Sequence, residues 1–170
     1  MNEEALEQMW DQMRQKYGVY LRLIEVIPED RLQTHPISGM RTPAELAAHM
    51  SGTVVRDITE GIADGEITAD EGAEAGVAAG LATTADALRF ARECWDRAQR
   101  AVDRIGDAEL QAMVSTPWDK AFPGWVGFHI QNDEFLHHRG QLYAYARACG
   151  VEPPFIWSFE ENAPEFRPAA

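Results

Sequence analysis

The stretch WVGFHIQNDEFLHHRGQLYAYARAC, residues 125–149, decides the fold of this chain. Its apolar residues recur every three or four positions, which is typical of one face of an α-helix. At 100° per residue that face consists of Phe128, Gln131, Glu134, Phe135, His138, Leu142, Tyr145 and Cys149. Gly150 follows as a C-terminal cap, and Pro153 prevents the helix from continuing. We therefore expect a long helix over residues 125–149.

Three other segments show the same periodicity. Residues 3–27 carry one apolar stripe that Pro28 ends, and residues 84–105 carry another that Gly106 is expected to cap. A further helix begins at Thr42, where Thr-Pro-Ala-Glu forms a capping box with proline at the first helical position. Its core stripe is predicted to be Leu46, His49, Met50, Thr53, Asp57 and Ile58. The sequence thus predicts an all-α fold, a four-helix bundle in which residues 1–170 form a single domain.

The connections differ in composition. Residues 61–80 contain glycines at five positions among alanines and acidic residues, which favours a long, flexible and partly helical crossover between the second and third helices. Residues 107–124 are expected to form a structured loop whose Trp118 and Phe122 cover one end of the bundle. The tail after Gly150 is rich in aromatic residues, so we expect it to pack back on the bundle or across a subunit boundary.

Charge and composition exclude several classes of function. The net charge of −13 opposes a role in nucleic-acid binding, which depends on neutralising phosphates. No apolar run is long enough to span a membrane, and the amino terminus lacks the features of a secretory signal. Cys94 and Cys149 lie too far apart for a CxxC motif. We expect a cytoplasmic protein with no nucleic-acid or membrane partner.

Two polar residues interrupt the apolar face of the last helix. Glu134 and His138 lie one turn apart and point the same way. A buried carboxylate is costly, whereas a divalent cation both neutralises it and uses the imidazole lone pair. His49 is a similar anomaly on the second helix, and two histidines with one carboxylate form a three-ligand metal site. A hydrogen-bonded core histidine at position 49 and an ordinary Glu/His contact on the last helix remain the alternatives.

Residues next to these candidates could orient a ligand or a substrate. The candidates for this role are His137, Arg139 and Gln141. His35 and His129 lie outside any ligand spacing, and we treat them as structural. Gly140 costs a helix interior about 0.8–1 kcal/mol relative to alanine, which suggests either a close helix crossing or room beside the metal, and close packing is the favoured reading.

The run His137-His138-Arg139-Gly140-Gln141-Leu142-Tyr143-Ala144-Tyr145, with Arg147, Gly150 and Pro153-Pro154 after it, resembles the last helix of the DinB/YfiT-like family. The capped second helix with His49 extends the resemblance over nearly the whole chain. It implies a four-helix bundle, a homodimer, and a metal site made by a histidine on the second helix and two residues four apart on the last. Those positions here are His49, Glu134 and His138, and the family has histidine where this chain has Glu134.

The resemblance also implies a chemistry, because better-understood relatives are thiol-dependent transferases and isomerases, and others are presumed hydrolases. We therefore expect one divalent ion (zinc, nickel, iron or manganese), a low-molecular-weight thiol, and a small electrophilic substrate that a metal-activated thiol or water attacks. The alternative is a non-catalytic, stress-associated bundle that binds a metal or another ligand. A third reading takes Glu134 as the loss of the site, which leaves a metal-free scaffold.

Overall fold

The structure is a computed structural model, and it describes residues 1–68 and 71–169. In chain order the elements are α1 (Glu3–Val26), the 3-10 turn η1 (Glu29–Arg31), α2 (Pro43–Ala48), the π-helix η2 (His49–Asp57), α3 (Ile58–Asp64), α4 (Glu71–Gly80), α5 (Thr84–Val102), α6 (Asp107–Gln111), β1 (Met113–Ser115), β2 (Ala121–Pro123), α7 (Gly124–Ala148), and the 3-10 turns η3 (Phe159–Glu161) and η4 (Pro164–Phe166). The described chain is mostly helical, as the sequence predicts.

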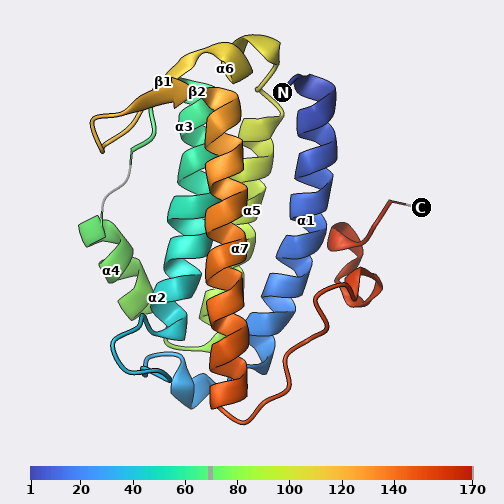
Figure 1. The fold of residues 1–170 in the computed structure, drawn as a ribbon. Helices are drawn as coiled ribbons and strands as arrows, with labels where there is room; N and C mark the ends of the chain where they lie inside the picture. Colours follow the sequence, from blue (N-terminus) through green and yellow to red (C-terminus); the bar gives the residue numbers. More distant parts are fainter. Residues whose placement is uncertain (69–70, 170) are drawn as a thin grey trace.

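The long helical segments lie side by side around a shared apolar core. Figure 1 shows α1, the continuous run α2–η2–α3, α5 and α7 packed against one another, with α7 in front of the others. Large aromatic side chains fill the space between them: Tyr17, Tyr20, Trp95, Phe128 and Phe135 are all buried. Their removal from water supplies the main driving force for this packing.

The second helical run begins as predicted. The Thr42 hydroxyl accepts a hydrogen bond from the Glu45 backbone N–H at 3.1 Å, and the Glu45 carboxylate accepts one from the Thr42 N–H at 2.7 Å. This reciprocal pair satisfies donors that would otherwise be unpaired at a helix start. Pro43 occupies the first helical position, where its missing N–H costs nothing.

The middle of this run is a π-helix, which the sequence did not predict. The Ile58 N–H bonds to the Thr53 carbonyl five residues earlier, so each turn in η2 contains an extra residue. The extra residue changes which side chains face the core. Val54 is buried there, whereas Thr53 and Asp57, predicted to lie on the core stripe, are only half-buried.

The glycine-rich stretch is more ordered than a flexible connection. Its residues 71–80 form α4, which packs against α2. The side-chain amide of Gln33 donates to the carbonyls of Ala78 and Leu81, both at 2.9 Å, and these contacts hold the C-terminal end of α4. Residues 69–70 of the predicted crossover lie outside the described residues.

The segment between α5 and α7 corrects two predictions. The third helix ends at Val102, and Gly106 begins α6 instead of capping α5: its N–H donates to the Glu109 carboxylate at 2.9 Å. A short antiparallel pair, β1 with β2, forms where a loop was expected. Phe122 packs against the core, but Trp118 is 53% exposed, so the prediction that it covers one end of the bundle is wrong.

The distal half of the C-terminal tail packs back on the helices. Phe166 is buried against Tyr17 and Trp95, and Figure 1 shows the tail alongside α1. Asn162 donates to the Gln15 carbonyl at 2.9 Å. This approach requires a glycine at position 18, because a Cβ there would lie 2.5 Å from the Asn162 amide nitrogen. The proximal part of the tail, residues 155–157, remains exposed.

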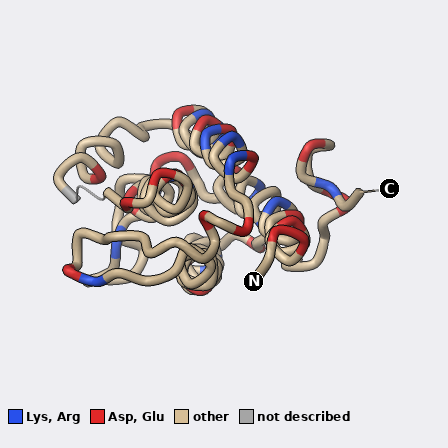
Figure 2. Tube along the Cα trace, turned by 90° about the horizontal axis from the view of Figure 1, so that it is seen from above, with Lys and Arg blue, Asp and Glu red and all other residues tan. Residues whose placement is uncertain are grey.

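Surface charge is mixed along the helices. Figure 2 shows Lys and Arg interspersed with Asp and Glu, and several of them form ion pairs between elements, such as Arg97 with Glu60 and Arg104 with Asp64. Among the described residues, every helix falls short of the length and apolar character that a membrane crossing demands.

Candidate metal centre

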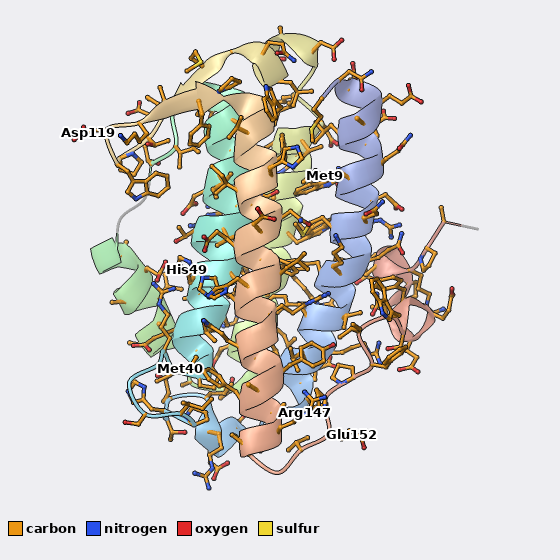
Figure 3. The ribbon with its side chains drawn as sticks, in the orientation of Figure 1. Met9, Met40, His49, Asp119, Arg147 and Glu152 are labelled. Carbon is orange, nitrogen blue, oxygen red and sulfur yellow. The ribbon has the colours of Figure 1, made fainter. Side chains whose placement is uncertain are left out.

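The three predicted ligands come together in the fold. His49 is the first residue of η2, and Glu134 and His138 lie one turn apart on α7, which packs against η2. Figure 3 shows His49 on the face of its helix between α4 and α7. One ligand atom from each of the three residues lies within 4.8 Å of the others. The His138 Nε2 atom is 3.3 Å from Glu134 Oε2.

The three side chains differ in exposure. The side chains of His49 and His138 are 16% and 11% exposed, whereas that of Glu134 is 48% exposed. The carboxylate therefore lies at the rim of the helix pair and not inside the apolar face, which differs from the expectation of a buried carboxylate. A half-exposed carboxylate needs no cation to offset its burial, so the arrangement of the donor atoms alone favours a metal here.

His49 is oriented from α4. Its Nδ1 atom lies 2.8 Å from Oε2 of Glu74, and the Thr53 hydroxyl donates to the same oxygen at 2.6 Å. Burial on its own raises the pKa of Glu74, but the hydrogen bonds from His49 and Thr53 outweigh it, so the pKa lies below its usual value. An ionised carboxylate only accepts hydrogen bonds, so the proton of a neutral His49 is on Nδ1 and the lone pair on Nε2.

His138 is oriented in the same way from its own helix. Its Nδ1 atom lies 3.1 Å from Oε1 of Gln141, an acceptor, so Nδ1 carries the proton and Nε2 faces Glu134 with its lone pair. Burial lowers the pKa of His138, which favours the neutral imidazole that a metal requires. The Gln141 amide nitrogen in turn lies 3.0 Å from Nε2 of His137.

The resulting donor set fits a divalent cation. Two imidazole lone pairs and a carboxylate oxygen converge, and such atoms repel one another unless a cation or a proton lies between them. Two histidines with one carboxylate are a known ligand set for zinc and for non-haem iron. Each imidazole also donates its other N–H to an oxygen, as metal-bound histidines almost always do.

The other polar residues that the sequence singled out lie elsewhere or have different partners. The charge of Arg139 acts on Lys16 of α1 and on Tyr143 of its own helix. His35 is outside the group of three ligands, and its Nδ1 atom lies 2.6 Å from the Met40 carbonyl oxygen.

Two further predictions concern residues of α7. His129, predicted to have a structural role, packs edge-on against Trp125. A Cβ at Gly140 would meet nothing within 4 Å, so the predicted close helix crossing there is wrong.

Glu74 is the functional residue that sequence reasoning missed. It lies in a segment of alanines and glycines, 25 positions after His49, and no motif links the two. Its role follows only from the docking of α4, which the composition of residues 61–80 argued against. Glu74 is one of several acidic residues in this segment, so composition gave no signal that singled it out.

A hollow lies beside the site. It has a volume of about 280 Å³ and is formed by η2, α4 and α5, with Thr53 and Glu74 on its wall. Arg56, Asp57 and Phe90 add a charged pair and an apolar surface to its lining. The hollow thus shares two residues with the hydrogen-bond network that orients His49.

Comparison with known proteins identifies the family. The DinB superfamily matches residues 11–142 of the chain. Among solved structures, a DinB-like protein from Bacillus subtilis, YjoA, superposes with a TM-score of 0.70 at 18% sequence identity, over 88% of this chain and 96% of that one. A search of curated proteins finds no match. The structural likeness concerns the fold alone, whereas the sequence match spans most of the chain, and this chain therefore belongs to the DinB superfamily.

Proposed function

We propose that this protein is a metal-dependent enzyme, a thiol-dependent transferase or a hydrolase that acts on a small electrophilic molecule. One observation carries the proposal: ligand atoms of His49, Glu134 and His138 lie within 4.8 Å of one another, while Nδ1 of each imidazole lies within hydrogen-bond distance of a side-chain oxygen. One cation placed among these atoms would satisfy all three donors at once.

The roles of the residues follow from this arrangement. His49, Glu134 and His138 would hold one divalent ion, and zinc, nickel, iron and manganese all suit the set. When bound, the ion supplies Lewis acidity that lowers the pKa of a thiol or a water molecule. The exposure of Glu134 leaves one side of the site open to solvent, and the hollow beside Glu74 offers space for a small molecule.

Metal content is the first test of the proposal. Untagged protein, analysed for metals, is expected to contain one divalent ion per chain, and His138→Ala is expected to lose it. Asp133→Asn is the matched control, because Asp133 is an exposed carboxylate next to Glu134 but outside the ligand group. This variant should bind as the wild type does.

Activity assays then separate the alternatives. Wild type and His138→Ala would be compared on a panel of thiols and electrophiles, and turnover that disappears with the metal supports the enzyme. Bound metal without turnover on the whole panel favours a non-catalytic metal-binding protein. Absence of metal at stoichiometric supply, with the fold retained, establishes the metal-free scaffold.

The proposal also includes the four-helix bundle as a homodimer. Phe155 and Trp157 are exposed by more than half of their surface and lie on the part of the tail that does not pack on α1. Adjacent large apolar groups of this kind are typical of protein interfaces. A molar mass of two chains by light scattering is expected, and a monomer at all concentrations would contradict it.

A further inference from the structure

Glu74 joins α4 to the candidate metal centre. Its Oε2 atom accepts hydrogen bonds from His49 at 2.8 Å and Thr53 at 2.6 Å, and its Oε1 atom lies 3.7 Å from the Arg41 guanidinium. The side chains of Glu74 and His49 are both largely shielded from solvent. A contact with several partners in a shielded place constrains orientation far more than an exposed ion pair does.

We infer that Glu74 is a positioning residue that fixes His49 for metal binding and couples the docking of α4 to occupancy of the site. The inference rests on the proposed function, because it takes His49 as a ligand. By accepting a hydrogen bond from Nδ1–H on the α4 side, Glu74 leaves Nε2 of His49 to bind the ion and makes that nitrogen more basic.

α4 depends on contacts of this kind because its own helical tendency is weak. It has ten residues, EGAEAGVAAG, whereas isolated helices shorter than about 12–15 residues are marginal in water. Its glycines at positions 72, 76 and 80 each cost about 1 kcal/mol relative to alanine where they lie in a helix interior. Gln33 holds the C-terminal end, and Glu74 anchors the other half to His49 and Thr53.

Docking of α4 and binding of the metal are two equilibria, and coupling between them works in both directions. If docked α4 holds His49 in the orientation that binds the ion, the ion must favour docked α4 by the same factor. Metal binding is therefore expected to stabilise α4 against local opening, although α4 itself contributes no ligand to the group of three.

The experiment titrates Co²⁺ into the metal-free full chain. Glu74→Ala should raise the dissociation constant about 10–100-fold and alter the visible Co²⁺ spectrum, as loss of an outer partner of a metal-bound histidine does. Glu74→Gln should have a smaller effect, because its amide oxygen still accepts the Nδ1 proton. Val77→Ala is the matched control: it trims another packed side chain of α4 but keeps the carboxylate, so it should weaken binding only through looser docking and by much less than Glu74→Ala does.

Hydrogen exchange provides the second readout. Co²⁺ should slow exchange of the amides of residues 71–80 in the wild type and leave them unchanged in Glu74→Ala, while far-UV circular dichroism confirms that both remain helical.

Each contrary result has a distinct meaning. Equal Co²⁺ affinity in wild type and Glu74→Ala overturns the positioning role and leaves the metal centre standing. A loss in Val77→Ala as large as in Glu74→Ala overturns the role of the carboxylate. Failure of the wild type itself to bind Co²⁺ contradicts the proposed function and therefore also this inference.

Discussion

At the scale of single residues, the spacing of polar groups predicted which side chains meet, but not what surrounds them. The four-residue step from Glu134 to His138 fixes their common direction on any α-helix, and His49 joins them because α7 packs on η2. Spacing says nothing about acceptors from other elements. The contact of Glu74 with His49 spans 25 positions and depends on tertiary packing, so no local pattern could reveal it.

The two cysteines should react very differently. Burial raises the pKa of Cys94 to about 11, so at pH 8 only about one thousandth of it is thiolate, compared with roughly a quarter for a free cysteine. Cys149 is partly exposed at the end of α7. In native protein at pH 8, a chromogenic disulfide reagent should label Cys149 quickly and Cys94 only as the pH approaches its pKa or after unfolding.

The Cys149→Ser variant isolates the buried thiol. It should show almost no fast labelling at pH 8, and full labelling in concentrated guanidinium. Rapid labelling of the native variant would show that solvent reaches Cys94 and would contradict the shifted pKa.

At the scale of elements, periodicity located the long helices well, and capping chemistry located some of their ends. The capping box at Thr42 and the left-handed Gly150 after α7 both occur as predicted. The predictions failed for glycines that can serve more than one structural role. Gly106 caps no helix but starts α6, and Gly140 occupies open space instead of a crossing. Composition alone cannot distinguish these roles, because the residues that surround a glycine in the fold are distant from it in sequence.

Two glycines of α7 should respond to alanine in opposite directions. At Gly140 the new methyl group meets nothing within 4 Å, so Gly140→Ala should raise the free energy of unfolding by about 0.8–1 kcal/mol through helix propensity. At Gly124 it would lie 2.5 Å from the Glu109 carbonyl oxygen, so Gly124→Ala should destabilise by about 1–3 kcal/mol. Urea unfolding measures both, and the same sign for the two variants would refute the assignment of open and crowded sites.

At the scale of the whole molecule, the sequence indicated an all-α class but left the role of the tail open. Its aromatic residues look alike in composition, yet Phe166 is 2% exposed and Phe155 is 68% exposed. They differ because α1 has no side chain at Gly18, where Asn162 and Phe166 pack against the helix. A packing site formed by several elements together leaves no pattern in the sequence of any one of them.

Replacing Phe166 and Phe155 with alanine should distinguish the packed part of the tail from the exposed part. Phe166→Ala should lower the free energy of unfolding by about 3 kcal/mol, because it empties a pocket against Tyr17 and Trp95. Phe155→Ala should change it by less than about 0.5 kcal/mol in dilute monomer. Denaturant titration compares the two, and similar losses would mean that the proximal tail is packed in solution as well.

The π-helix has a consequence for how the chain can vary. Because a turn of η2 contains more residues than an α-helical turn, deleting one residue can return that turn to α geometry while the helix on either side keeps its phase. A residue removed from 50–57 in this way would leave His49 facing α7 and the buried face of α3 facing the core. Descendants of this sequence can thus lose a residue within η2, whereas the same deletion in a regular α-helix such as α5 would rotate one half of the helix against the other by about 100°.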